Sequence, residues 1–112
     1  MSFETIQAYF EQFGMADRCM DLKESSATVA LAALALGTEE ARIAKTLSFL
    51  VEEAPVIVVT AGDARIDNHK YKIFFHKKPK MIPGEECEKN IGHRPGGVCP
   101  FCLPPTAGIY LD

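Results

Sequence analysis

A β-hairpin near the middle of the chain is the strongest structural signal in this sequence. Residues 45–51 place apolar side chains at every second position, which is the period of a strand. Residues 55–60 read Pro-Val-Ile-Val-Val-Thr, a β-branched run typical of a strand. Only residues 52–54 separate the two segments, so we expect them to pair as antiparallel neighbours. The chain must therefore contain a sheet.

Helical patterns and short extended segments surround this hairpin. Helices are predicted over residues 3–13, 29–36, 38–44, 68–76 and 83–91. Asp67 is placed to cap the fourth of these helices, and Gly14, Gly37 and Gly92 are placed to end the first, second and fifth. Short strands are expected at residues 17–23, 80–82 and 108–112.

Several apolar side chains on these helices are expected in the core. The phenylalanines of residues 3–13 recur at helical spacing, and residues 29–36 are apolar nearly all round. Both patterns predict buried helices. Ile73 and Phe74 are likewise expected to point inward from the fourth helix.

Composition and charge exclude several classes of protein. The 112 residues are 47% apolar and 24% charged, which fits one globular domain. A net charge of −3 gives no overall basic field for nucleic acid, although a local patch can still bind RNA. The start of the chain lacks the pattern of a signal peptide, and no run approaches the roughly 20 apolar residues of a membrane span. We therefore expect a cytoplasmic protein whose cysteines are thiols or metal ligands.

Residues 92–101, Gly-His-Arg-Pro-Gly-Gly-Val-Cys-Pro-Phe, form the most distinctive loop. Three glycines and two prolines in ten residues exclude a helix interior or a central strand. A structural turn explains such a run without any function. Gly96 and Gly97 also lack side chains, so their backbone N–H groups could cradle a carbonyl oxygen, carboxylate or phosphate.

The same part of the chain holds a potential metal or redox site. Cys87, His93, Cys99 and Cys102 follow the spacing C-x5-H-x5-C-x2-C. Three cysteines and a histidine can bind zinc tetrahedrally, and a C-x2-C pair can act as a redox dithiol. Plain thiols are the third interpretation, and the spacing alone does not choose among the three.

Lysines supply the other candidate binding groups. Lys45 stands where a short helix is expected to become a strand, either as a solvated residue or as a ligand for a phosphate or ester carbonyl. Residues 69–80 contain five lysines and two histidines, which form either a solvated face or a contact for a phosphodiester backbone. No Ser/His/Asp order or nucleotide-binding glycine motif is present. A hydrolase with this sequence would therefore hold its substrate and position a water.

Three segments together resemble the YbaK/aminoacyl-tRNA deacylase family. They are residues 44–49, Ala-Lys-Thr-Leu-Ser-Phe, residues 55–63, which end in Ala-Gly-Asp, and the loop at residues 92–101. Their combination is far more specific than any one of them. The family consists of free-standing editing domains related to the insertion domain of bacterial prolyl-tRNA synthetase.

The resemblance implies a fold and an activity. The expected fold is α+β, with a curved, mixed, mainly antiparallel, barrel-like sheet surrounded by helices, and residues 1–112 form a single such domain. Family members commonly continue for several more strands and a helix, so C-terminal strands are expected to be missing, and a homodimer could complete the sheet. The implied reaction hydrolyses the ester between a wrong amino acid and the 3′ end of a tRNA, most simply Ala, Cys or Ser on a proline tRNA. It needs no metal or other cofactor.

The resemblance also assigns residues to roles. Lys45 matches the family's invariant lysine, which is expected to bind the terminal adenosine's phosphate or the ester. Gly96 and Gly97 would act in catalysis through their backbone. The expected substrate-binding residues are Thr46, Gly62, Asp63, Gly92, His93 and Pro95. The alanine-rich residues 29–35 are small enough to form the wall of a small amino-acid pocket.

Two further function classes remain open. The same pocket could hold a tRNA end, an aminoacyl group or a nucleotide without turnover. Alternatively, Cys87, His93, Cys99 and Cys102 could bind zinc in a small interaction domain.

Overall fold

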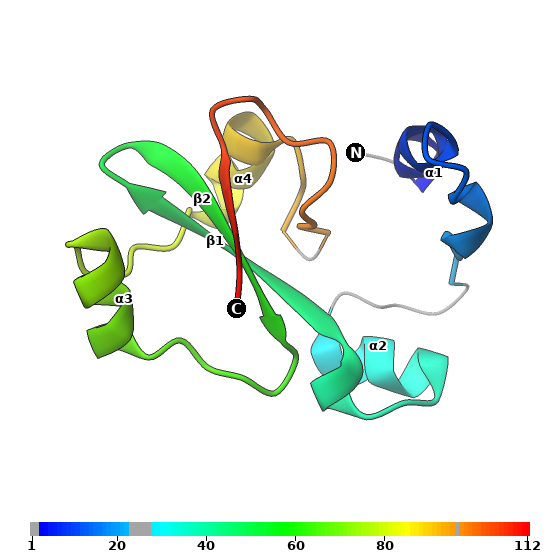
Figure 1. The fold of residues 1–112 in the computed structure, drawn as a ribbon, viewed down its shortest axis with the longest axis horizontal. Helices are drawn as coiled ribbons and strands as arrows, with labels where there is room; N and C mark the ends of the chain where they lie inside the picture. The colour runs from blue at the N-terminus through cyan, green and yellow to red at the C-terminus, as the bar shows by residue number, and fades with distance from the viewer. Residues whose placement is uncertain (1–2, 23–27, 96) are drawn as a thin grey trace.

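The computed structural model describes residues 3–22, 28–95 and 97–112 and has an α+β fold (Figure 1). Its sheet contains β1 (Ala44–Val51), β2 (Ala54–Ala61) and β3 (Gly108–Leu111), in the order β1-β2-β3. β1 and β2 are antiparallel, whereas β2 and β3 are parallel. The sheet is therefore mixed, as expected. Three strands leave it open in the described part of the chain, so the barrel-like closure is not seen.

The predicted hairpin is confirmed. β1 and β2 pair without interruption from Ala44 opposite Ala61 to Val51 opposite Ala54. Glu52 and Glu53 make the turn with φ values of 50° and 70°. Two consecutive positive φ values are typical of a type I′ turn, whose twist matches that of the strands it joins. Glutamate is an unusual residue there, because its Cβ disfavours the left-handed region.

Replacing Glu53 with glycine is expected to stabilise the protein. Glycine removes the steric cost of the 70° φ, and the gain should be about 0.5–1 kcal/mol after glycine's larger entropy loss on folding. The matched control is Glu39→Gly, because Glu39 has an ordinary φ of −80°. Urea denaturation should raise the midpoint for Glu53→Gly and lower it for Glu39→Gly. Equal shifts in the same direction would contradict this account of the turn.

The described residues form four α-helices: α1 (Phe3–Glu11), α2 (Val29–Leu36), α3 (Asn68–Phe75) and α4 (Gly84–Ile91). The predicted caps are present, since the Asp67 carboxylate accepts hydrogen bonds from the backbone N–H groups of His69 and Lys70. Gly37 and Gly92 end their helices with φ values of 64° and 77°. No helix in these described ranges has the length and apolar character that a bilayer span requires.

Three predicted elements are wrong or shorter than expected. Residues 17–22 contain the end of a 3₁₀ turn, η1 (Ala16–Arg18), and no strand. The helix predicted at 38–44 is only the 3₁₀ turn η2 (Glu40–Arg42), because β1 already begins at Ala44. The strand at 80–82 is reduced to one bridge between Met81 and Phe49. Prolines on both sides of that segment lack the N–H groups that would extend the ladder.

The core lies on both faces of the hairpin. On one face Ile57 packs with Ile82, Cys87 and Ile91, so α4 covers this face. Neighbouring strand residues point to the opposite face. There Phe49 contacts the ring of Tyr71 from α3, with ring centroids 5.1 Å apart. α3 and α4 therefore cover opposite faces of the sheet.

The predictions of buried helices are wrong for this structure. α1 contains no buried residue, and Phe13 is 59% exposed. α2 buries only Ala33, and Leu34 is 77% exposed. In α3 the buried residue is Tyr71, whereas Ile73 and Phe74 are exposed. Figure 1 shows the reason for α1 and α2, which lie at the periphery rather than across the sheet.

Candidate functional site

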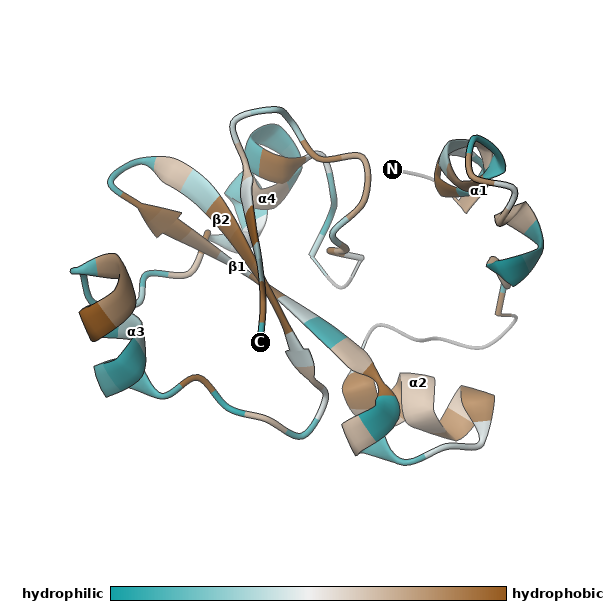
Figure 2. Ribbon diagram, in the orientation of Figure 1, coloured by the Kyte–Doolittle hydropathy of each residue, from teal (hydrophilic) through white to brown (hydrophobic). Residues whose placement is uncertain are grey.

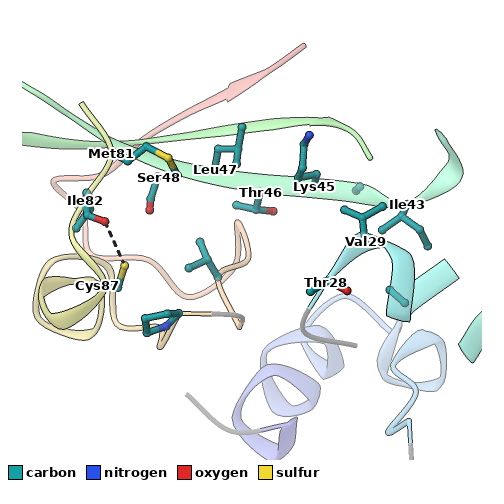
Figure 3. A pocket seen from close by; sticks show the side chains of 15 residues that line it. Thr28, Val29, Ile43, Lys45, Thr46, Leu47, Ser48, Met81, Ile82 and Cys87 are labelled. Atoms are coloured by element: carbon teal, nitrogen blue, oxygen red, sulfur yellow. Dashed lines mark hydrogen bonds between the residues drawn. The ribbon is translucent and has the colours of Figure 1, made fainter. Parts of the chain in front are cut away.

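A pocket of about 340 Å³ lies between α2, the first half of β1 and the segments around α4 (Figure 3). The residues that line it are mainly small or apolar, together with hydroxyl groups and one lysine. They include Val29, Ala32, Lys45, Thr46, Ser48, Cys87, Pro95 and Val98. The alanine-rich helix α2 therefore contributes to the wall through Val29 and Ala32.

β1 divides its side chains between two environments. Thr46 and Ser48 project from one face of the strand, and Lys45 and Leu47 project from the other (Figure 3). This is the ordinary alternation of a strand. Ser48 is buried, at 5% exposure. The pocket wall on this side therefore presents two hydroxyl groups spaced two residues apart.

Lys45 lines the pocket, but its ammonium group is held elsewhere. Its Nζ donates a hydrogen bond to the backbone carbonyl of Ala64, in the loop that follows β2. An ammonium group has three donors, so two N–H groups remain for a ligand after this bond is made. Lys45 lines the pocket near the start of β1, while its side chain projects from the face of the strand opposite to Thr46 and Ser48 (Figure 3).

The glycine- and proline-rich loop forms the side of the pocket opposite α2. α4 ends at Gly92, and the imidazole of His93 is almost fully buried, at 2% exposure. His93 Nε2 lies 2.7 Å from the carbonyl oxygen of Phe101 and 3.6 Å from Cys99 Sγ. These contacts tie the two ends of the loop together. Pro95 then reaches the pocket wall.

The structure describes only one of the two glycines proposed for catalysis. Gly96 lies outside the described residues. Gly97 is exposed, and its N–H donates to the carbonyl of Arg94 over 2.9 Å, within a turn. A ligand would therefore have to replace that hydrogen bond to use this N–H group.

Gly62 and Asp63 do not line this pocket. Gly62 is buried, and a Cβ at this position would come 2.2 Å from the carbonyl oxygen of Glu40. Its lack of a side chain is thus required for packing against η2. Asp63 is exposed and immediately precedes Ala64, the acceptor for Lys45. Of the predicted site residues, Lys45, Thr46 and Pro95 line the pocket. Gly62 and Asp63 precede the Lys45 acceptor Ala64, and Gly92, His93 and Gly97 lie in the loop outside the lining.

The cysteines do not assemble a metal site. Among residues 3–22, 28–95 and 97–112, no three His, Cys, Asp or Glu side chains are grouped to hold a metal ion. Cys87 belongs to the core cluster, and its thiol donates to the carbonyl of Ile82 over 3.8 Å. The geometry therefore gives no support to the zinc alternative. Burial raises the pKa of the Cys99 thiol, which disfavours the thiolate needed for redox chemistry.

Two contributors to the site were not identified from the sequence. Ser48 is one polar position in an alternating strand, and the signal that could identify it is its i, i+2 spacing from Thr46, which places both side chains on one face. Ala64 has a backbone acceptor that no sequence pattern distinguishes. Only the fold places it beside Lys45.

Comparisons with known proteins agree with the predicted family. The model of the family described as the aminoacyl-tRNA editing domain matches residues 23–112. A Bacillus subtilis (strain 168) protein, the uncharacterized protein YwhH, is 40% identical over 113 residues, covering 100% of this chain and 72% of that protein. A structure described as a proposed trans-editing enzyme for prolyl tRNA synthetase superposes with a TM-score of 0.83 at 26% identity, covering 100% of this chain and 73% of that one. The hypothetical protein APE2540 gives a TM-score of 0.75 at 32% identity over 83% of this chain, which spans 63% of the length of that protein.

Proposed function

Because the chain belongs to the aminoacyl-tRNA editing domain family, we propose that it is a trans-editing hydrolase that cleaves the ester of mischarged aminoacyl-tRNA. The observation that carries this proposal is the pocket of about 340 Å³ beside Lys45. This volume is at the lower end of the range for ligand sites. It suits a small aminoacyl ester, while the bulk of the tRNA stays outside.

Lys45 would bind the phosphate or ester at the end of the tRNA. Two of its three N–H donors are free to do so, and the bond to Ala64 fixes the position of the ammonium group. Gly62 and Asp63 support this arrangement, because they lead the chain to Ala64. A positive charge fixed in advance stabilises the negative charge that develops when water attacks an ester.

The aminoacyl group would occupy the pocket beyond Lys45. Thr46 and Ser48 offer hydroxyl groups to its amino group, and Val29 and Ala32 limit its size. Pro95, with Gly92 and His93 behind it, would close the other side, and the backbone of Gly96 and Gly97 would hold the reacting carbonyl. We propose alanine, serine or cysteine as the amino acid, because the walls limit its size, and a proline tRNA as the carrier. A substrate of this kind places the reaction in the cytoplasm.

We propose water as the nucleophile. The described hydroxyl and thiol groups of the pocket belong to Thr28, Thr46, Ser48 and Cys87, and none of them has a hydrogen bond to a histidine base in this structure. Positioning is then the main contribution of the protein, and well-oriented reactants can account for about 7–11 kcal/mol of a barrier.

The direct test is hydrolysis of a panel of purified mischarged tRNAs, Ala-, Ser- and Cys-tRNA of the proline type, with correctly charged Pro-tRNA as the control. We expect loss of the ester for at least one mischarged member, with Pro-tRNA left intact. If the folded protein binds these tRNAs and hydrolyses none, the protein is a binding module and the hydrolase proposal is wrong.

A further inference from the structure

A second pocket lies on the face of the sheet that carries the Lys45 side chain. We propose that it binds one nucleotide of the unpaired tRNA end, with its base among the aromatic rings of α3 and β3 and its phosphate on Arg65 and Lys70. The pocket has a volume of about 340 Å³ and includes Arg65, Lys70, Tyr71, Phe74, Phe75 and Tyr110. This inference rests on the proposed function, since it assigns a second contact to the same tRNA substrate.

The register of the hairpin places this pocket beside Lys45. Lys45 pairs with Thr60, and Thr60 lines the pocket. Side chains of directly opposed residues in an antiparallel pair share a face. Ala64, which accepts the hydrogen bond from Lys45, also immediately precedes Arg65. A nucleic acid end bound at Lys45 therefore has this pocket as its neighbour, with the aminoacyl pocket on the opposite face of β1.

Aromatic rings give the pocket surfaces on which a base can stack. Phe74 and Phe75 lie 5.5 and 5.2 Å from Tyr110 between ring centroids, and Tyr71 lies 4.6 Å from Phe75. Phe74 is 64% exposed, so part of this aromatic cluster is open to a ligand. Figure 2 shows the first half of α3 as hydrophilic and its second half as hydrophobic. Basic groups next to stacking rings are the usual means of binding single-stranded nucleic acid.

Tyr71 supplies an independent indication of a ligand. The residue is 5% exposed, and its hydroxyl has no hydrogen-bond partner among the described residues. Burial raises the pKa of Tyr71, so the hydroxyl remains a neutral donor. An unpaired buried hydroxyl costs free energy. Its oxygen has less than 1 Å² of accessible surface, so a small side-chain movement on binding would let a ring nitrogen or carbonyl of a base accept its hydrogen bond and remove that cost.

The charges of the pocket fit a mononucleotide with an amino-bearing base. Arg65 and Lys70 can neutralise one phosphate, whereas Asp67 is engaged by the N–H groups at the start of α3. Asp112 adds a second carboxylate to the lining. A carboxylate accepts hydrogen bonds from the exocyclic amine of cytosine or adenine and finds no such donor on uracil.

Calorimetric titration of the wild-type protein with AMP, CMP and UMP tests the pocket without requiring hydrolysis. We expect AMP and CMP to bind more tightly than UMP. Tyr71→Phe, which deletes only the hydroxyl, should raise Kd by roughly 3- to 10-fold, and Arg65→Ala should do the same. The matched controls are Tyr9→Phe on α1 and Arg18→Ala on η1, outside this pocket, and both should leave Kd unchanged. Absence of binding up to about 10 mM, or equal effects in the controls, would overturn the proposal.

Kinetics separates the failure of this inference from the failure of the proposed function. With mischarged tRNA as substrate, Tyr71→Phe should raise KM and leave kcat unchanged. Hydrolysis with an unaltered KM would refute the nucleotide pocket and leave the hydrolase intact. If the protein binds nucleotides in a way that depends on Tyr71 but hydrolyses no substrate, the nucleotide pocket is supported and the proposed hydrolase function is wrong.

Discussion

Lys45→Ala is expected to lower kcat/KM for mischarged tRNA by roughly 100-fold or more. The substitution removes the only described cation of the aminoacyl pocket, together with the two N–H donors left free by the bond to Ala64. That bond is a single backbone contact of a partly buried side chain, so its loss should cost only about 1 kcal/mol of folding free energy. Single-turnover hydrolysis and thermal unfolding measured on the same samples separate the two effects.

Two variants sharpen this experiment. Lys45→Arg keeps the charge but changes the donor geometry, and we expect activity between the wild type and the alanine variant. Lys89→Ala removes an exposed lysine from α4 that lies outside the pocket, so it controls for the change in net charge. Hydrolysis retained by Lys45→Ala at the rate of Lys89→Ala would exclude a catalytic role for Lys45.

The sequence predicted the hairpin and the helix ends because both depend on local physics. Alternating apolar residues and a short connection define the antiparallel pairing of β1 and β2. An aspartate at the N-cap of α3 and glycines at the ends of α2 and α4 satisfy the backbone groups of their own turns. Information of this kind is contained in a few neighbouring residues.

Burial was less predictable, because it depends on what distant segments cover. Residues 29–36 are as apolar as a core helix, yet α2 buries only Ala33. α3 shows the same limit, because Tyr71 rather than Ile73 or Phe74 faces Phe49. An apolar pattern indicates which helix face can be buried, but it does not indicate whether another segment of the chain packs against that face.

The candidate site could be predicted from the sequence only in part. Lys45 and Thr46 are adjacent in a strand, so their side chains must point to opposite faces, and this follows from the sequence alone. Which face holds the aminoacyl pocket and which holds the Lys45 acceptor depends on α4 and on the loop carrying Ala64. Those positions are set by tertiary packing, and Gly62 is a position where this packing leaves no room for a side chain.

Gly62→Ala is therefore expected to be the most destabilising single methyl addition among the described glycines. The new Cβ would lie 2.2 Å from the carbonyl oxygen of Glu40 and 3.0 Å from that of Ile43, besides 2.7 Å from Val29 Cγ1. Val29 can rotate away, but the two backbone oxygens move only with η2 and the start of β1. Overpacking of this kind costs about 3 kcal/mol, which should lower Tm by roughly 10–15 °C in a domain of this size.

Gly84→Ala is the matched control for Gly62→Ala, because its nearest foreign atom, Pro95 Cγ, is 3.4 Å from the added Cβ. Gly84 is the first residue of α4, so alanine there should leave Tm unchanged or raise it slightly. The backbone shift forced by Gly62→Ala would also displace Ala64 and, with it, the ammonium group of Lys45. Hydrolysis measured well below the new Tm should consequently fall as well. If both alanine variants unfold within about 2 °C of the wild type, the close contact with η2 does not exist in solution, and the support it gives to Lys45 must come from elsewhere.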